Sequence, residues 1–519
     1  MAAAASGTPG AMMAGAFQRI ATRMVSEERA GLTFVLFLLL HAVLWSLLPG
    51  LTRHELDSDS MMHFAWGQEW QWSYRLHPPL QPWVVAGFLN VFGINNAAYV
   101  VLSQVNIVLA FIAIWFLARQ FLSAPAALAA VCVLEFIPYY SFFSQRFNHS
   151  GLLISLWAFT TLFAYFALHR QRLLDWILLG LFAAASMLCK YYSVTLLTAI
   201  ALVFLCSTQG RSTLRTWGPY IALTLFSTMM ILHVQLVLSD RIGTIHHIGD
   251  YFDIASLAWR WQPIKFFLAQ LLYVAPAVIV FLVATRNHQA RCPWYVLFSR
   301  GSWDHSNRML YVVTFFPLLV TALPGIVLGV AVSSRWGAPL LGMAGILLIM
   351  QCPGTLSVEH YRRIVVAAFA WAIFLPLLIL TAHGFGWVTN DAVAFPGKEL
   401  AATITERWHA HHQTPLRVVG GGRVTPDSIA FHSLDHPSAL QNLNFSWSPW
   451  VTPGKIRRHG MAVVCLASDD ECIKRANEWF PSKQWISLAV TGVSSRFARV
   501  IEADVRYFFI APGQYEITQ

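Results

Sequence analysis

Four titratable side chains stand close together just after the first apolar segment of the chain: His54, Glu55, Asp57 and Asp59. Ionisable groups are costly inside a membrane, so a cluster at the end of an apolar segment indicates a functional site. A carboxylate within hydrogen-bond reach can take the proton of a hydroxyl that attacks a carbon atom. Asp57 and Asp59 are therefore candidate general bases, and the alternative is a solvated pair of loop acids.

Several cations occur in or beside apolar segments, where a bound anion would offset their cost. Lys190 lies between two such segments, and the guanidinium of Arg335 can hold a phosphate through two hydrogen bonds. Fixed cations stabilise a departing phosphate because negative charge grows on it during the reaction. The alternatives are a lysine that extends to the membrane surface, an Arg-Trp anchor and a polar turn. The candidate phosphate ligands are Lys190, Arg335, Arg146 and Arg260, and the candidate substrate contacts are Asn148, His149, Tyr191, His77, His246 and His247.

The histidines of residues 240–263 do not form a metal motif. His246 and His247 are adjacent, so their side chains would point apart on a helix, and no HExxH-type spacing occurs. The chain also lacks the glycine-rich phosphate loops of nucleotide-binding folds, and Gly420-Gly421-Gly422 is interpreted as a plain turn after a strand. We therefore predict no metal and no other cofactor.

The elements that must position these residues are membrane helices. Hydrophobic residues make up 56% of the 519 residues and charged residues only 12%, which is typical of a polytopic membrane protein. The basic residues are spread between apolar runs and form no continuous basic face, so we expect no nucleic-acid partner. The apolar runs predict eleven transmembrane helices, at residues 31–48, 98–117, 124–143, 150–168, 173–188, 191–207, 217–239, 264–285, 309–332, 336–352 and 364–382.

Charge asymmetry predicts the orientation of these helices. With residues 1–30 in the cytoplasm, the inner loops carry fourteen basic residues and the outer faces eight, as the positive-inside rule requires. Residues 31–387 then form the transmembrane domain, and the odd number of helices places residues 388–519 outside. The expected location is the inner membrane of a bacterium, with this C-terminal domain in the periplasm.

The outer segments are expected to contain further structure. Met62, Trp66 and Trp70 recur at intervals of four and predict an amphipathic helix in the membrane interface, followed by a second interfacial helix at about 80–93. Residues 388–519 alternate helical and strand patterns, which predicts a small α/β domain. Cys465 and Cys472 are close in sequence and are a plausible disulfide in a periplasmic domain.

The stretch from Asp57 to Trp83 resembles the first outer loop of polyprenyl-phosphate-sugar-dependent glycosyltransferases of the GT-C class. It contains the acid pair, Trp66-Gly67-Gln68, Tyr74 and an HPPL..W pattern that begins at His77. The branch that it resembles is family 39-like, related to protein O-mannosyltransferases and lipid A aminoarabinose transferases. Similar segments recur at residues 147–157, 180–191, 335–339, 431–440 and 448–450.

The resemblance implies an inverting transfer of a sugar from a polyprenyl phosphate to an acceptor hydroxyl on the outer face. It places Asp59 where the family has its catalytic aspartate. This chain has Ser60 where the family often has Glu, and Met62 replaces a nearby acid, so Asp57 is the alternative base. His149 stands where some relatives carry an acid.

We therefore predict a GT-C-like helical membrane protein with a small C-terminal α/β domain that acts as a glycosyltransferase. Its expected partners are a polyprenyl-phosphate-linked sugar, membrane lipid, and a cell-envelope glycan, lipopolysaccharide or protein as acceptor. Two other classes remain as alternatives: a secondary transporter with a periplasmic cap, and a lipid-dependent assembly partner without catalysis. Transporters commonly show internal repeats and helices broken at the midplane, whereas the unusual residues here gather at one membrane face.

Overall fold

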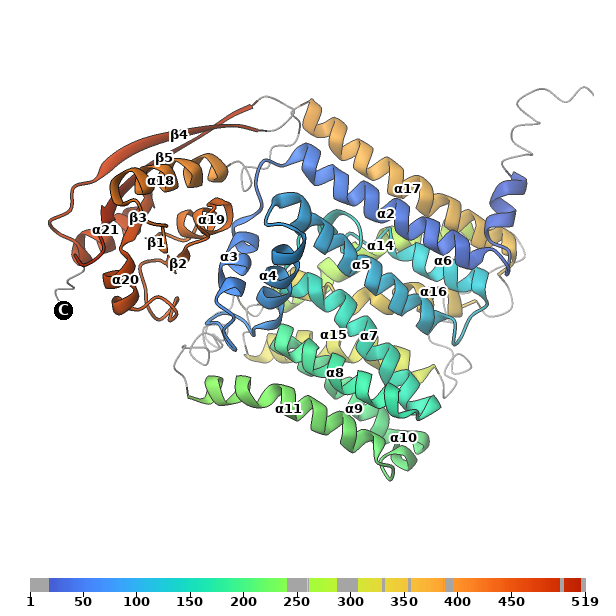
Figure 1. Cartoon of the computed structure of the whole chain (residues 1–519). Helices are drawn as coiled ribbons and strands as arrows, with labels where there is room; N and C mark the ends of the chain where they lie inside the picture. The colour runs from blue at the N-terminus through green and yellow to red at the C-terminus, as the bar shows by residue number, and fades with distance from the viewer. Residues whose placement is uncertain are drawn as a thin grey trace, which may run out of the picture.

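The computed structural model divides the chain into a helical bundle and a sheet domain that caps one end of it (Figure 1). The first described helical residues lie at the other end of the bundle (Figure 1). The structure describes residues 18–239, 259, 261–286, 307–328, 332–352, 356–385, 387, 395–494 and 499–514.

Each of the eleven expected spans falls on an apolar helical segment. Among the described residues, six helices are long and apolar enough to cross a membrane: α2 (Ala30–Thr52), α5 (Asn96–Ala118), α7 (His149–Arg170), α11 (Gly218–Leu238), α14 (Gln262–Ala284) and α17 (Val358–Gly384). The other five expected spans fall on shorter apolar segments: α6 (Ala124–Leu134), α8 (Leu173–Cys189), Tyr191–Cys206, which contains α9 (Val194–Cys206), Arg308–Leu323 within α15 (Arg308–Leu328), and the broken segment Ser334–Met350.

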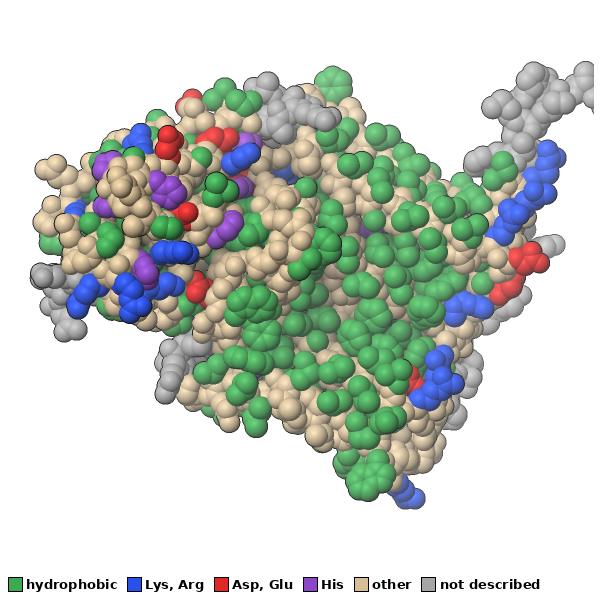
Figure 2. Space-filling view, viewed as in Figure 1, with side chains coloured by type: hydrophobic (Ala, Val, Ile, Leu, Met, Phe, Trp, Pro, Cys, Tyr) green, Lys and Arg blue, Asp and Glu red, His purple; other side chains and the backbone are tan. Residues whose placement is uncertain are grey.

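The surface agrees with a membrane setting. Hydrophobic side chains cover the visible face of the bundle, whereas charged side chains gather over the sheet domain and at the opposite end (Figure 2). Large apolar side chains such as Leu223 on α11 and Leu377 on α17 are more than half exposed. Exposed apolar area of this extent is stable only against lipid or another apolar partner.

Two expected spans are interrupted, and both interruptions lead to the candidate site. α6 ends at Leu134, and the chain continues past Pro138 to a 3-10 turn, η1 (Phe142–Gln145). The segment Ser334–Met350 begins with two 3-10 turns, η5 (Ser334–Gly337) and η6 (Leu340–Met343), before the short helix α16 (Ala344–Met350). Proline lacks a backbone donor and disfavours helix in the residue before it, which explains the breaks at Pro138 and Pro339.

The C-terminal domain is a five-stranded sheet with the strand order β2-β1-β3-β5-β4. β1 runs parallel to β2 and β3, whereas β5 runs antiparallel to β3 and β4. Helices cover both faces, since residues of α18 pack in one core cluster and residues of α20 and α21 in the other. The elements are β1 (Val418–Gly421), β2 (Ser438–Gln441), β3 (Met461–Leu466), β4 (Ile486–Ser494), β5 (Arg499–Ile510), α18 (Gly397–His412), α19 (Thr425–His432), α20 (Pro453–His459) and α21 (Asp470–Trp479). The predicted small α/β domain is confirmed.

The cysteine pair of this domain forms a disulfide in the structure. Cys465 at the end of β3 is bonded to Cys472 in α21, and their Cα atoms are 5.9 Å apart. The bond ties the helix to the central strand of the sheet, within the core cluster that the two elements share.

Both helices expected in the first outer loop are present, as α3 (Ser58–Gln68) and α4 (Leu80–Phe92). The expectation that the tryptophan face of the first helix lies in the lipid interface was wrong. Trp66 is 1% exposed and its Nε1 donates to Gln441 Oε1 of the C-terminal domain at 3.1 Å, while Trp70 lies beyond the end of the helix. The face of α3 that carries Trp66 packs against the C-terminal domain instead of lipid.

Candidate active site

A cavity of about 500 Å³ lies where the helical bundle meets the C-terminal domain. Its walls come from α3 and the loop that follows it, the first turn of α7, the residue after α8, η5, and two loops of the C-terminal domain. Six residues predicted from the sequence line it: Asp59, His77, Asn148, His149, Lys190 and Arg335. The structure therefore brings one carboxylate and two of the predicted cations into a single space.

The two aspartates of the first outer loop are placed differently. Asp57 is the N-cap of α3, and its carboxylate accepts from Ser60 N at 3.2 Å and from Ser60 Oγ at 3.0 Å. Such a cap satisfies backbone donors that the first helical turn leaves free. Asp59 lies in that turn and lines the cavity, where its Oδ1 accepts from Arg423 Nη2 at 3.1 Å. Asp57 is thus a helix cap, and Asp59 is the aspartate of the pair that lines the cavity.

Lys190 is held at the membrane side of the cavity by the end of α8. It is the C-cap residue, and its extended backbone turns the chain away from the helix. Its Nζ donates to Ser150 Oγ at 3.0 Å and lies 4.7 Å from the centre of the Trp336 ring. Burial lowers the pKa of Lys190 to about 7. An ammonium group in this setting gains strongly from a bound anion.

Lys190 faces the first turn of α7, where free backbone donors add to the positive field. Asn148 caps this helix, with its Oδ1 accepting from Gly151 N at 2.9 Å. The helix N-terminus and the lysine reinforce each other at Ser150, which lies in the same turn. This corner of the cavity is suited to a phosphate group.

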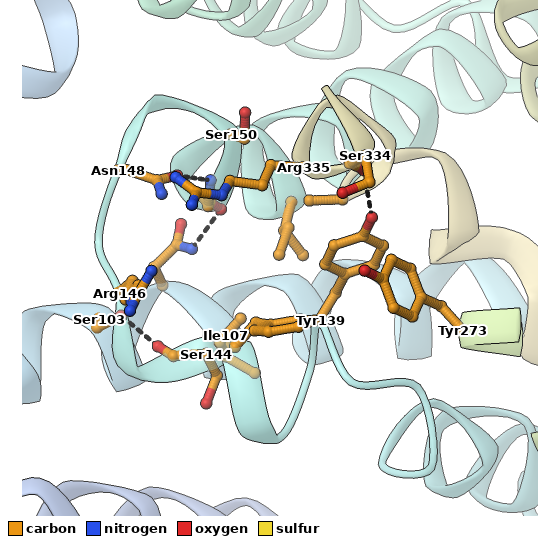
Figure 3. A pocket seen from close by; sticks show the side chains of 15 residues that line it. Ser103, Ile107, Tyr139, Ser144, Arg146, Asn148, Ser150, Tyr273, Ser334 and Arg335 are labelled. Carbon is orange, nitrogen blue, oxygen red and sulfur yellow. Dashed lines mark hydrogen bonds between the residues drawn. The ribbon is translucent and has the colours of Figure 1, made fainter. Parts of the chain in front are cut away.

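Arg335 reaches the same corner from η5, and Figure 3 shows its side chain extending toward Asn148 and Ser150. The turn is fixed from behind, because Ser334 O accepts from Tyr139 Oη at 2.6 Å and from Gln270 Nε2 at 3.1 Å. A Cβ at Gly337 would meet the Gln270 amide, so a larger residue here would displace the side chain that holds the turn.

A smaller cavity of about 270 Å³ adjoins the first one (Figure 3). Asn148, Ser150 and Arg335 line both cavities, so the two meet at the first turn of α7. The predicted cation Arg146 lines only the smaller one, together with Tyr139 and Tyr273. Arg53 lies nearby, and its pKa is lowered to about 10 by burial and by the charge of Arg146.

Three histidines cluster at the cavity wall. The ring of His149 lies 3.9 Å from that of His77 and 4.7 Å from that of His63, measured between centroids. Burial lowers the pKa of His63 to about 4, so this ring is neutral at pH 7. Within the described part of the chain, no group of three or more His, Cys, Asp or Glu side chains is placed to hold a metal ion. That the reaction needs no metal ion is still a prediction.

The remaining predicted residues lie elsewhere. His246, His247 and Arg260 lie outside the described residues. Tyr191 is absent from the linings of the two cavities, and its hydroxyl is hydrogen-bonded to His233 Nε2 at 2.9 Å.

The cavity residues that sequence reasoning missed include His63, Arg75, Ser150, Arg423 and Trp447. Arg423 follows the glycine run that was interpreted as a plain turn, and this turn does project it into the cavity. The usable signal was its position at the carboxyl end of a parallel strand, where binding residues of such sheets commonly lie. Arg75 stacks on Trp447 with its guanidinium carbon 4.9 Å from the ring centre, a contact between distant segments that no local pattern indicates.

Comparisons with known proteins agree with the fold. The family model described as dolichyl-phosphate-mannose-protein mannosyltransferase matches residues 76–234, a region that contains His77, Asn148 and Lys190. A search of the curated proteins finds no match. The crystal structure of ArnT from Cupriavidus metallidurans bound to undecaprenyl phosphate is similar, with a TM-score of 0.62, 12% identity, and coverage of 91% of this chain and 97% of that one. The apo structure of the same enzyme gives a TM-score of 0.59 and 14% identity over the same shares.

The chain matches the family model over residues 76–234 and resembles glycosyltransferases of the GT-C class. It has the fold of ArnT over nearly its whole length, and the resemblance predicted from its first outer loop is confirmed. The transporter alternative is not supported, because the described site lies at one end of the bundle under the C-terminal domain.

Proposed function

We propose that the chain transfers a sugar from a polyprenyl phosphate to an acceptor hydroxyl, with inversion at the anomeric carbon, on the periplasmic face of a bacterial inner membrane. The observation that carries the proposal is the single cavity that holds Asp59 together with Lys190 and Arg335. The solved relative with bound undecaprenyl phosphate supports a lipid donor of the same kind.

The donor phosphate is assigned to the corner formed by Lys190, Ser150 and Arg335. Both cations come from the membrane domain, and the first turn of α7 adds its backbone donors. The ester oxygen of the phosphate gains negative charge as its bond to the sugar breaks. Cations held in place stabilise that transition state more than the ground state.

Asp59 is assigned as the general base. The acceptor oxygen forms a bond to the anomeric carbon, the bond from that carbon to the phosphate oxygen breaks, and its electron pair leaves with the polyprenyl phosphate. The proton of the acceptor hydroxyl passes to the Asp59 carboxylate, which lines the cavity on the wall formed by α3. No diphosphate leaves in this reaction, which reduces the need for a divalent metal.

The acceptor is assigned to the aqueous side of the cavity, where the C-terminal domain contributes its wall. A cell-envelope glycan such as lipopolysaccharide suits an enzyme that works at this face. The prenyl chain of the donor is assigned to the apolar surface of the bundle.

Complementation of a deletion strain tests the proposal. Mass spectrometry of the envelope glycans should show that the strain lacks one sugar substituent and that the wild-type chain restores it. The isosteric change Asp59→Asn removes the base and should reduce restoration by at least about a hundredfold, the lower end of the effect of general base catalysis.

Asp57→Asn is the matched control, since asparagine is an equally good N-cap and the change lies two residues away. It should restore the substituent nearly in full. Full restoration by Asp59→Asn, in a strain with normal amounts of the protein, would reassign the base.

A further inference from the structure

The C-terminal domain places a cation directly on the candidate base. Arg423 follows β1 and Gly422 and precedes α19, so the strand end fixes its backbone. Its Nη2 lies 3.1 Å from Asp59 Oδ1, in a contact that joins residues 364 positions apart. Both side chains line the larger cavity. The proposed reaction gives this arginine no task, because Lys190 and Arg335 already hold the phosphate.

The ion pair is open to replacement by a ligand. The Arg423 side chain is 53% exposed and that of Asp59 is 42% exposed. Exposed pairs of this kind contribute only about 0–1 kcal/mol. A guanidinium has five N–H donors, and the contact with Asp59 is the one hydrogen bond found for Arg423 among the described residues. Donors therefore remain for another oxygen-rich group.

The position of Arg423 relative to the reaction identifies that group. In an inverting transfer the acceptor oxygen and the departing phosphate lie on opposite sides of the anomeric carbon. Asp59 takes the acceptor's proton and so marks the acceptor's side. Arg423, bound to Asp59, lies on that side as well.

We propose that Arg423 is the acceptor-positioning residue and that it holds one oxygen of the Asp59 carboxylate until the acceptor arrives. This inference rests on the proposed function. In the free protein Arg423 occupies one oxygen of the Asp59 carboxylate. An incoming hydroxyl-rich acceptor replaces the pair, with its reacting hydroxyl donating to Asp59 and a neighbouring oxygen accepting from Arg423.

The inference predicts a side reaction when Arg423 is removed. Water then takes the acceptor's place: its oxygen bonds to the anomeric carbon, a proton passes to Asp59, and free sugar and polyprenyl phosphate are released. Loss of Arg423 should therefore weaken acceptor use and at the same time raise the release of polyprenyl phosphate without transfer.

The experiment uses the full chain in lipid nanodiscs. Lipid extracted from a strain that lacks the protein supplies the donor, and the unmodified envelope-glycan fraction of the same strain supplies the acceptor. Mass spectrometry measures the sugar transferred to the glycan and the polyprenyl phosphate released. Arg423→Gln is compared with Arg417→Gln, an exposed arginine just before the same strand.

The wild-type chain and Arg417→Gln should release one polyprenyl phosphate for each sugar transferred. Arg423→Gln should need about tenfold more acceptor for half-maximal transfer, the effect of one lost charged hydrogen bond. It should also release polyprenyl phosphate in excess, with the donor requirement unchanged. Arg423→Lys should recover part of the coupling because it keeps the charge.

An Arg423→Gln variant that matches Arg417→Gln in acceptor requirement and coupling would overturn the inference. So would a weakened donor requirement, which would place Arg423 in the donor site. Asp59→Asn in the same assay separates the two proposals: full activity defeats the proposed function, whereas an inactive Asp59→Asn beside an unchanged Arg423→Gln defeats this inference alone.

Discussion

In the proposed mechanism Lys190 binds the donor phosphate, although burial disfavours its charged form. Its pKa is lowered to about 7 by desolvation, so near neutral pH the free protein holds the side chain about half protonated. In the proposed mechanism the protonated form binds the donor phosphate. The protonated fraction falls as the pH rises through about 7, so donor binding must weaken in that direction.

The affinity of the purified protein for undecaprenyl phosphate should therefore fall by roughly tenfold per pH unit above pH 7. Lys190→Ala should bind weakly at every pH, and its affinity should lose this slope. Binding can be followed by tryptophan fluorescence between pH 6 and pH 9. If Lys190→Ala binds as tightly as the wild type, the lysine merely extends to the membrane surface, as the alternative interpretation held.

At the scale of elements, a buried acid lies in the contact between α19 and α3. Both oxygens of Asp427 accept from Gln441 Nε2, at 2.8 and 2.7 Å, and Gln441 Oε1 accepts from Trp66 of α3. Burial raises the pKa of Asp427 to about 8, well above its value in an unfolded chain. The folded state therefore keeps a proton that the unfolded state releases.

The sign of the resulting pH dependence follows from linkage. Between about pH 4 and pH 8 the folded protein binds more protons than the unfolded one at this site, so the free energy of unfolding decreases as the pH rises. Asp427→Asn keeps the shape and removes the titration. Its thermal midpoint should exceed that of the wild type by a margin that grows from pH 5 to pH 8 and then levels off.

Thermal unfolding of the purified variants checks this, with Glu471→Gln as the control because its carboxylate is 80% exposed. A margin that stays constant with pH would show that Asp427 does not hold its proton in the folded protein.

At the scale of the whole molecule, the orientation in the membrane remains a proposal that the chain's own cysteines can test. Cys206 is a free, exposed thiol at the end of α9, on the face assigned to the cytoplasm. Leu434 in the C-terminal domain is 94% exposed. The variant Leu434→Cys should react with a membrane-impermeant maleimide in spheroplasts, whereas Cys206 should react only after permeabilisation. The reverse pattern would invert the assigned topology and move the reaction to the cytoplasmic face.

Local sequence properties were enough for the architecture. Long apolar runs predicted the eleven helical segments, because the hydropathy of a segment depends only on its own residues. A strand pattern that runs into a glycine turn predicted Val418–Gly421, and Val418 and Val419 of this strand enter opposite core clusters. Charged side chains are costly beside apolar segments, so Lys190 and Arg335 indicated an anion-binding site. The structure brings both into one cavity.

The tertiary structure alone decided which acid faces the cavity and what stands beside it. Asp57 and Asp59 are two residues apart and chemically identical, and only the start of α3 makes one a helix cap and the other a cavity residue. Arg423 and Trp66 find their partners across the docked C-terminal domain, hundreds of positions away. Hydropathy and periodicity are properties of neighbouring residues, whereas such contacts depend on how two finished domains pack, so no local pattern carries them.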